Sequence, residues 1–477
     1  MKLFEILRGI EYRSSADISF VEISGIVTDS RKVKEGYLFV AIPGIDEEKH
    51  GRQFIGDAIK NGAAAILTDE PVFTDIPVIT AKPILETLAL CCKAFYNDPI
   101  KDIKMIGVTG TNGKTTVTNL IRDILSRIKG VKVGLIGTNY IAIGDELKPA
   151  ENTTPEASEL WKIFAEMQKE KCTHIVMEVS SHALALQRVY GISFDVAAFT
   201  NLTKDHLDYH GSMESYAHAK SHLFRNSKIS AINIDADFHD KMLAAAGETA
   251  VTFTLKSDNA SYIVKNVHLS AAGVCFEVTN KNITETVKLG IPGEFSVYNA
   301  LTAYVVCNEI SIDRKAVLEG LACSKGVKSR IEIVQTQKTK ATVIIDYAHT
   351  PDALDNVLKT IRAITTGKIY TLFGCGGNRD KTKRSEMGEI AGTLSDFCII
   401  SSDNPRFEKP MDIINDILPG IKKTECPYIM IENRAEAIEY GIKAAGDGDV
   451  LLLAGKGHEN YIEIEGVKHH FDERELF

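Results

Sequence analysis

Short apolar runs alternate with amphipathic segments through most of the chain. The apolar run at 103–110, IKMIGVTG, is followed at 115–128 by TTVTNLIRDILSRI, and then by a second apolar run at 132–137. A short apolar run predicts a buried strand, whereas apolar residues repeated every three or four positions predict a helix. The alternation therefore predicts β-α-β units, and so an α/β protein built on parallel sheets.

Breaks in this pattern predict three domains. A turn-rich break lies at 97–99, and a fresh strand-like run, ATVIIDYAHT at 341–350, follows a boundary near 329–330. A chain of 477 residues is long enough for about three domains of ordinary size. The expected domains are an N-terminal domain at 1–98, a central domain at 99–329 and a C-terminal domain at 330–477.

The composition is that of a globular protein that acts on small molecules. Hydrophobic residues make up 44% and charged residues 25%, and the formal net charge is −9. An acidic chain is a poor general nucleic-acid binder, although a local basic pocket can still hold an anionic substrate. Nine scattered cysteines without a CxxC pair, and no long apolar run, indicate a cytoplasmic protein without a membrane span.

A glycine-rich loop with a lysine follows the strand-like run that begins at residue 103. The segment 107–116 reads GVTGTNGKTT and precedes the predicted helix. Backbone N–H groups of such a loop can face phosphates, while Lys114 supplies positive charge and the Thr115 hydroxyl suits Mg²⁺. The spacing departs from the usual P-loop because Val108 stands where a glycine is expected. A simple glycine turn is the minor alternative.

Acidic, histidine and lysine residues in the middle of the chain suggest further chemistry. Glu178 ends a strand-like run, where a carboxylate can hold Mg²⁺ directly or through water; a structural role is an equal alternative. Lys220, within SYAHAKSHLF, would by itself be interpreted as a helix-surface lysine. A cluster without any zinc signature suggests a metal or phosphate site, with capping as the default alternative: Asp205, His206, Asp208 and His210.

Taken in order, the motifs of this chain resemble those of the Mur ligases of peptidoglycan synthesis. The resemblance covers nearly the whole chain and rests on TDSR at 28–31, TGTNGKTT at 109–116, NTTP at 152–155, EVSSHAL at 178–184, NLTKDHLDYHG at 201–211, PGEFSVYNALTA at 292–303, SRIE at 329–332, DYAHTPDAL at 346–354 and AGKGHE at 454–459. It implies a small UDP-binding N-terminal domain, a central P-loop-type ATPase domain and a Rossmann-like C-terminal domain. The implied enzyme is a monomeric, ADP-forming acid–amino-acid ligase.

The resemblance also implies roles for individual residues. Phosphate, Mg²⁺ and catalysis would involve Lys114, Thr115, Glu178, His206 and Lys220, the last as a carbamate made with CO₂. ATP would contact Gly110, Thr111, Asn112, Gly113, Lys114, Thr115, Thr116, Asn299, Arg330 and His349. The UDP-muramoyl dipeptide would contact Thr28, Ser30, Asn152, Thr153, Thr154, Ser180 and Arg188.

The segment SDNPR at 402–406 bears on which amino acid is added. By itself it is a turn after the strand-like run FCIIS, but Asp-Asn-Pro-Arg resembles the form in members that add meso-diaminopimelate. The guanidinium of Arg406 can grip the distal carboxylate of diaminopimelate, which lysine lacks, and an unpaired Arg406 would penalise lysine. The implied pocket contains Arg379, Asp403, Asn404, Pro405, Arg406, Gly455 and Glu459.

Other functions stay open. A folylpolyglutamate synthetase would share the phosphate loop, and a neighbouring Mur ligase would add L-lysine or the D-Ala-D-Ala dipeptide. A non-catalytic nucleotide-binding regulator would be expected to lack Lys114, Glu178 or Lys220, and all three are present. The sequence does not identify the base that deprotonates the incoming amine.

Overall fold

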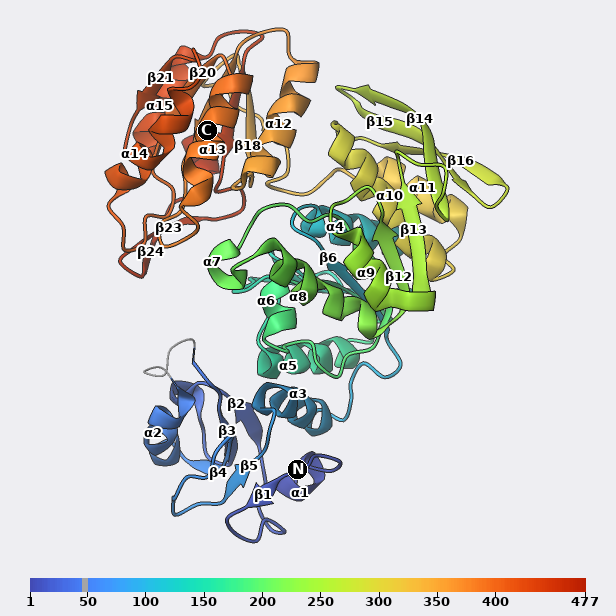
Figure 1. The fold of residues 1–477 in the computed structure, drawn as a ribbon, viewed down its shortest axis with the longest axis vertical. Helices are drawn as coiled ribbons and strands as arrows, with labels where there is room; N and C mark the ends of the chain where they lie inside the picture. The colour runs from blue at the N-terminus through green and yellow to red at the C-terminus, as the bar shows by residue number, and fades with distance from the viewer. Residues whose placement is uncertain (45–49) are drawn as a thin grey trace. The chain divides into compact units, whose positions relative to one another are not determined.

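The computed structural model describes residues 1–44 and 50–477 and contains three large sheets with helices packed against them (Figure 1). This architecture confirms the predicted α/β class. By its internal contacts the chain forms two compact units. The first unit comprises 1–107, 129–197 and 222–228, and the second comprises 108–128, 198–221 and 229–477. The domain boundaries at 98 and 329 stay predictions.

The N-terminal sheet belongs to the first unit and has the strand order β1-β5-β4-β3-β2. Its strands are β1 (Arg13–Ser14), β2 (Gly25–Val27), β3 (Tyr37–Ala41), β4 (Ala63–Thr68) and β5 (Val78–Thr80), and its helices are α1 (Leu3–Ile6), α2 (Ile55–Lys60) and α3 (Ile84–Phe95). All neighbours are parallel except β1 and β5. As predicted, Cys91 and Cys92 are buried helix residues, both in α3.

The middle sheet has eleven strands in the order β16-β15-β14-β13-β12-β11-β6-β10-β7-β8-β9. The strands are β6 (Lys104–Thr109), β7 (Val133–Ile136), β8 (Ile141–Ile143), β9 (Glu146–Lys148), β10 (His174–Glu178), β11 (Phe194–Phe199), β12 (Ser227–Asn233), β13 (Ala250–Thr254), β14 (Tyr262–Ser270), β15 (Gly273–Asn280) and β16 (Ile283–Leu289). Its helices are α4 (Lys114–Leu125), α5 (Ala157–Lys169), α6 (Ser181–Ala185), α7 (Leu207–His210), α8 (Met213–Arg225), α9 (His239–Ala246), α10 (Glu294–Glu309) and α11 (Arg314–Cys323).

This sheet is mixed: parallel strands form its middle, as the β-α-β pattern predicts, and antiparallel strands form its two edges. Strands β10 and β7 are parallel, as are β12 and β13. At one edge β14, β15 and β16 are antiparallel, and at the other so are β7, β8 and β9. The physical reason is loop length: only two residues separate β14 from β15 and β15 from β16, and so short a loop can only join antiparallel strands.

The C-terminal sheet lies within the second unit and has the order β17-β18-β22-β19-β20-β21. It contains β17 (Glu332–Val334), β18 (Thr342–Asp346), β19 (Ile369–Phe373), β20 (Phe397–Ile400), β21 (Tyr428–Met430) and β22 (Val450–Ala454), with helices α12 (Pro351–Ile364), α13 (Thr382–Leu394), α14 (Pro410–Ile421) and α15 (Arg434–Ala444), and a hairpin of β23 (Tyr461–Ile464) and β24 (Val467–His470). Only β17 is antiparallel to its neighbour within the sheet.

Helices cover both faces of this C-terminal sheet. Residues of α12, α13 and α14 form one core cluster with the sheet, and residues of α15 form another with alternate strand positions (Figure 1). Strand β22, Val-Leu-Leu-Leu-Ala, is buried at every position because both of its faces are covered. Polar loops therefore follow the carboxyl ends of buried parallel strands, which is where α/β sheets bind ligands. Within the described ranges, no helix combines the length and apolarity needed to cross a membrane.

Candidate active site

The predicted phosphate loop connects the end of β6 to the start of α4. Gly110 and Gly113 have φ angles of 149° and 88°, which side chains of L-residues rarely adopt. A Cβ at Gly110 would lie 1.9 Å from Oγ1 of Thr200. Both glycines are thus required by the backbone path, and the first N–H groups of α4 open onto the loop.

Lys114 lies folded over this loop at the N-terminus of α4. Its Nζ donates to the carbonyl oxygens of Gly110 and Thr111, each at 2.9 Å. Thr115 is buried, and its hydroxyl accepts from Nη2 of Arg330 at 3.4 Å. The helix N-terminus, one ammonium and one guanidinium together form an electropositive environment suited to a phosphate chain.

Lys220 is not a surface residue, so its interpretation as an ordinary helix-surface lysine is wrong. It lies on α8 with only 1% of its surface exposed, and its Nζ donates to the carbonyl oxygen of Gly110 at 2.9 Å. The Nζ also lies 4.5 Å from the centre of the Tyr216 ring. Burial, followed by the nearby charge of Lys114, holds the pKa of Lys220 well below its ordinary value. A neutral amine is the form that can add CO₂.

Asp205 and His206 lie side by side in the second unit, close enough for an ion pair when the imidazole is protonated. Nε2 of His206 lies 3.3 Å from Oδ2 of Asp205, which is almost fully buried. Burial would raise the pKa of Asp205, but the charges of His206, His349 and Lys383 lower it overall. Asp205 therefore stays ionised and can orient His206. In the part of the chain that the structure describes, no group of three or more His, Cys, Asp or Glu residues forms a ready metal site.

Two more predicted nucleotide contacts, Arg330 and His349, meet at one aromatic ring. The guanidinium carbon of Arg330 lies 5.0 Å from the ring centre of Tyr347, and the His349 ring lies 4.5 Å from the same centre. Burial and the charge of Lys383 lower the pKa of His349 to about 4, so its imidazole is neutral at pH 7. Tyr347 was missed in the sequence because an aromatic residue after a buried strand has many structural uses.

Asn299, from α10, approaches the phosphate loop. A Cβ at Gly113 would lie 2.5 Å from its Oδ1. Asn112 of the same loop donates its backbone N–H to Oδ1 of Asn201 at 2.9 Å and its side-chain Nδ2 to Asp352 at 2.6 Å. The second unit therefore brings together the residues predicted to contact ATP, and their roles stay predictions.

Glu178 ends β10 in the first unit and is held in one orientation. Its Oε1 accepts from the backbone N–H of Thr138 at 2.8 Å, and its Oε2 accepts from the hydroxyl of the same residue at 2.9 Å. The hydroxyl of Thr138 lies 3.0 Å from that of Thr153. A Cβ at Gly137 would lie 2.5 Å from Oε1 of Glu178, so glycine is needed beside the carboxylate.

Four residues predicted to contact the UDP-muramoyl dipeptide lie around this strand end, and Thr153 is one of them. The hydroxyl of Thr154 donates to the carbonyl oxygen of Glu178 at 2.8 Å and accepts from the N–H of Ser180 at 3.1 Å. Nη1 of Arg188 donates to the carbonyl oxygen of Thr154 at 3.0 Å. These hydrogen bonds join the end of β10, the loop that contains Thr154 and the start of helix α6 into one polar network.

The remaining three residues of that predicted set have different surroundings. Ser30 is buried, and its carbonyl oxygen accepts from Nδ2 of Asn61 at 2.9 Å. Thr28 is partly exposed and Asn152 is exposed. Their predicted contacts with the UDP-linked substrate stay predictions.

The residues predicted to bind the amino acid gather beyond the ends of β20 and β22. Nδ2 of Asn404 donates to Oε2 of Glu459 at 2.7 Å. Gly455 has a φ angle of 113°, and a Cβ there would lie 2.7 Å from Oδ2 of Asp403. Burial, followed by the charge of Asp403, raises the pKa of Glu459. The pocket therefore contains two carboxylates that repel each other and need a cation between them.

Lys456 supplies that cation and was missed in the sequence. Its side chain is fully buried, and its Nζ donates to Oδ1 of Asn404 and Oε2 of Glu459, both at 3.2 Å, and lies 3.8 Å from Oδ1 of Asp403. Burial raises the pKa of Asp403, but nearby positive charges lower it overall, and the charge of Lys456 has the largest lowering effect. A lysine between two glycines ordinarily suggests an exposed loop, so local pattern does not identify this role.

Two arginines border the same pocket. Both side chains lie beside Gly376, because a Cβ added to this glycine would lie 3.0 Å from Nη1 of Arg406 and 3.9 Å from Cγ of Arg379. Arg379 donates to the carbonyl oxygen of Asn378 at 3.3 Å. Arg406 follows Pro405 and has a φ of 52°, a left-handed conformation that costs on the order of 1 kcal/mol and is typical of functional sites.

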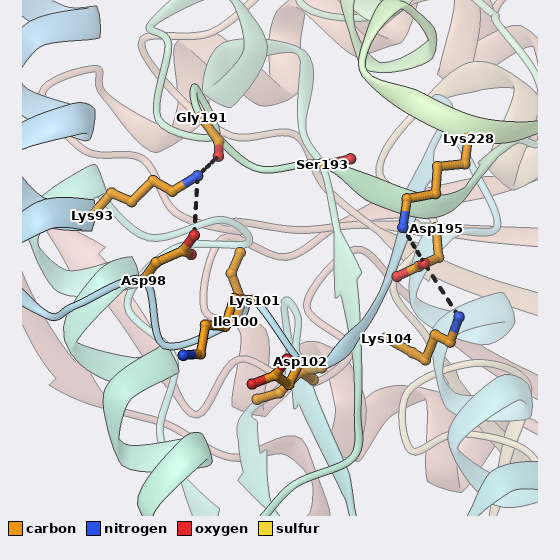
Figure 2. Close-up of a pocket in the computed structure, with 11 residues that line it drawn as sticks. Lys93, Asp98, Ile100, Lys101, Asp102, Lys104, Gly191, Ser193, Asp195 and Lys228 are labelled. Carbon is orange, nitrogen blue, oxygen red and sulfur yellow. Dashed lines mark hydrogen bonds and ion pairs between the residues drawn. The ribbon is translucent and has the colours of Figure 1, made fainter. Parts of the chain in front are cut away.

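A cavity of about 300 Å³ lies elsewhere, in the first unit (Figure 2). Lys93 lies 3.4 Å from Asp98 and donates to Gly191 at 3.0 Å, while Lys104 and Lys228 both pair with Asp195. None of the predicted site residues lines this cavity. The lining carries four lysine and three aspartate side chains, most of them in lysine–aspartate pairs.

A phosphate loop at a helix N-terminus, a buried lysine of lowered pKa beside it and charged loops beyond parallel strands define a nucleotide-using α/β enzyme. Comparison with known families is more specific. The Mur ligase family catalytic domain matches residues 22–105, the Mur ligase middle domain matches 108–307, and the Mur ligase glutamate ligase domain matches 329–457. The chain belongs to the Mur ligase family and is an ATP-dependent ligase.

Similar proteins match along nearly their whole length. UDP-N-acetylmuramoyl-L-alanyl-D-glutamate--2,6-diaminopimelate ligase of Caldanaerobacter subterraneus subsp. tengcongensis is 44% identical, over 100% of this chain and 98% of that protein. The ligase of the same name from Bacillus licheniformis is 42% identical, over 95% of this chain and 94% of that protein.

Solved structures agree with the fold. A structure of a ligase with the same name has a TM-score of 0.69 and 32% identity, covering 97% of this chain and 95% of that chain. A MurF ligase from Thermotoga maritima in complex with ADP has a TM-score of 0.61 at 19% identity, covering 90% of this chain and 93% of that one. At that identity the likeness shows the fold alone.

Proposed function

We propose that this enzyme uses ATP to join meso-2,6-diaminopimelate to the γ-carboxylate of D-glutamate in UDP-N-acetylmuramoyl-L-alanyl-D-glutamate, a step of peptidoglycan precursor synthesis. The observation that carries the proposal is full-length identity above 40% with ligases of that name. The pocket of Asn404, Arg406, Lys456 and Glu459 supports it, because its fixed charges suit a substrate with a charged far end.

The chemistry explains why such a site needs ATP. A carboxylate is a poor acyl donor, but transfer of the γ-phosphoryl group of ATP to its oxygen forms an acyl phosphate and ADP. The free amine of the amino acid then attacks the acyl carbon, the C–N bond forms, and the C–O bond to phosphate breaks. The main tasks of the protein are positioning and charge neutralisation. The phosphate loop and Lys114 are arranged to bind the β- and γ-phosphates.

The donor set fits Mg²⁺. In the second unit, the Thr115 hydroxyl and a carbamate on Lys220 are oxygen ligands of the kind Mg²⁺ prefers, and His206 would help to place the ions. In the first unit, the oriented carboxylate of Glu178 is a ligand of the same kind. When bound, Mg²⁺ neutralises the phosphate oxygens during transfer. The lowered pKa of Lys220 favours the neutral amine, the form that reacts with CO₂ and releases a proton to give the carbamate.

The choice of diaminopimelate over lysine follows from the far end of the substrate. Diaminopimelate carries both an ammonium and a carboxylate there, and lysine carries only the ammonium. We infer that Glu459 binds the ammonium and Arg406 the carboxylate, with Arg379, Asp403 and Gly455 completing the pocket. Location in the cytoplasm and a monomeric state are further predictions of this proposal.

Measuring ADP release with a panel of amino acids tests the proposal. The purified enzyme, Mg-ATP and UDP-N-acetylmuramoyl-L-alanyl-D-glutamate are combined with meso-diaminopimelate, L-lysine or D-Ala-D-Ala. ADP formation should need both the UDP-linked acid and diaminopimelate. Turnover with lysine or D-Ala-D-Ala instead would assign the chain to a neighbouring ligase. Turnover on a folate substrate would favour a folylpolyglutamate synthetase.

A further inference from the structure

Arg406 already contacts a carboxylate of its own chain. Its Nε donates to Oε2 of Glu463 at 3.1 Å, and its Nη1 donates to the carbonyl oxygen of Gly377 at 2.9 Å. The two side chains of the ion pair are 18% and 22% exposed. Two of the three guanidinium nitrogens are therefore engaged by the protein, and one of their acceptors carries the same charge as the substrate group expected there.

Backbone contacts hold Glu463 in this place. The N–H of Arg406 donates to the carbonyl oxygen of Glu463 at 3.0 Å, and the N–H of Glu463 donates to Oδ1 of Asn404 at 2.9 Å. The N–H of Glu465 donates to the carbonyl oxygen of Arg406 at 2.8 Å. Strand β23 is thus bonded along the loop 404–406, which keeps the backbone of Glu463 next to Arg406.

The other end of the pocket is paired in the same way. Lys456 contacts Glu459, the group expected to receive the distal ammonium of diaminopimelate, at 3.2 Å. Glu463 contacts Arg406, the group expected to receive the distal carboxylate. The resident ammonium and carboxylate thus match the two charges of the substrate's far end. Lys456 is fully buried and also bonds to Asn404, whereas Glu463 is partly exposed and can move away.

We propose that Glu463 is a resident competitor for the distal carboxylate of the amino-acid substrate. It pairs with Arg406 before the substrate binds and gives up this ion pair when diaminopimelate binds; the inference rests on the proposed function. A bidentate grip needs two parallel N–H groups, and Nε is engaged by Glu463. Two carboxylates at one guanidinium also repel each other. A partly exposed ion pair is weak, so its exchange costs little.

This pairing changes the expected selectivity. If Arg406 had no partner of its own, the binding of lysine would be unfavourable, because lysine brings no distal carboxylate to the guanidinium. With Glu463 in place, Arg406 keeps a partner when lysine binds, so the penalty is reduced. Glu463 therefore weakens the binding of diaminopimelate and also weakens discrimination against lysine.

The test compares Glu463→Gln with Glu465→Gln. Both remove one negative charge from the same hairpin, but the side chain of Glu465 is exposed and only its backbone bonds to Arg406. KM values for diaminopimelate, lysine and ATP are measured for each variant and for the wild type. For Glu463→Gln the diaminopimelate KM should fall about two- to five-fold, the size of a surface ion pair. The ATP KM of Glu463→Gln and all three KM values of Glu465→Gln should not change.

Selectivity gives a second readout. The ratio of kcat/KM for diaminopimelate to that for lysine should rise in Glu463→Gln. An unchanged or raised diaminopimelate KM would overturn the inference and make Glu463 a residue that orients Arg406. In Glu463→Ala, which carries no side-chain amide, the diaminopimelate KM should also fall. The unfolding temperature of this variant is measured to check that it is folded. If the wild type itself does not use diaminopimelate, the proposed function fails; if only the variant does not respond, the inference alone fails.

Discussion

Lys114 and Lys220 share one acceptor, since the Nζ of each donates to the carbonyl oxygen of Gly110 at 2.9 Å. Two ammonium groups at one carbonyl would repel each other. Lys220, which is fully buried, is the one whose pKa falls well below its ordinary value. The phosphate loop therefore places beside Lys114 a second lysine whose pKa is well below its ordinary value, so the two can do different chemistry.

Lys220→Arg should abolish ligation, because arginine keeps a positive charge but cannot form a carbamate at neutral pH. We expect less than about 1% of wild-type turnover, the loss typical of one preorganised electrostatic group. Incubation of the wild type with ¹³C-bicarbonate should give a carbamate carbon signal by NMR that the variant lacks. Full activity of the variant, or a signal that persists in it, would contradict the assignment.

Lys114→Ala should leave less than about 1% of activity, since its ammonium lies on the loop expected to bind the phosphates. The measurement is steady-state ADP release, with nucleotide binding followed separately by calorimetry. Lys340→Ala, which removes an exposed lysine on another part of the chain, is the control. Near-normal turnover of purified Lys114→Ala would refute the role.

Arg406→Ala should raise the KM for diaminopimelate about 10- to 100-fold, the size of a lost hydrogen bond to a charged group. The KM for ATP should change far less, because the guanidinium faces the amino-acid pocket. Arg406→Lys keeps the charge but lacks the parallel N–H groups of a guanidinium, so its KM for diaminopimelate should lie between those of the wild type and Arg406→Ala. Equal changes in both KM values would remove the argument for specificity.

Lys456→Met should destabilise the C-terminal sheet region and weaken diaminopimelate binding together. Removing a fully buried cation leaves Asp403 and Glu459 facing each other, which costs about 3–5 kcal/mol in comparable sites. Chemical denaturation measures the stability, and KM values measure the binding. An unchanged free energy of unfolding would mean that other contacts keep the two carboxylates apart without Lys456.

His349 should make the free energy of unfolding depend on pH. Its pKa in the folded protein is about 4, below the ordinary value of about 6.5, because burial and Lys383 disfavour the imidazolium. The unfolded chain then binds the proton first, so the contribution is full above pH about 6.5 and is lost as pH falls towards 4. His349→Gln should flatten the decline in stability between these values. An identical slope in wild type and variant would exclude this contribution.

Part of this site could be predicted from local sequence. The path of the phosphate loop depends on Gly110 and Gly113, whose conformations only glycine adopts readily, so the residue types themselves predict the turn. Strand ends such as that of Glu178 follow from apolar runs. Lys220 is different, because its sequence surroundings are those of an exposed helix position and only packing against Gly110 and Tyr216 buries it.

The sequence by itself determined the α/β class, the phosphate loop and the family, because these depend on periodicity, glycine conformation and ordered motifs along the chain. Only the tertiary structure decided which charges meet in the amino-acid pocket. Arg406 and Glu463 are 57 residues apart, and Lys456 is 52 residues from Asn404. Electrostatic energy depends on distance in space and on burial, and both are set when the loops beyond β20 and β22 are packed together.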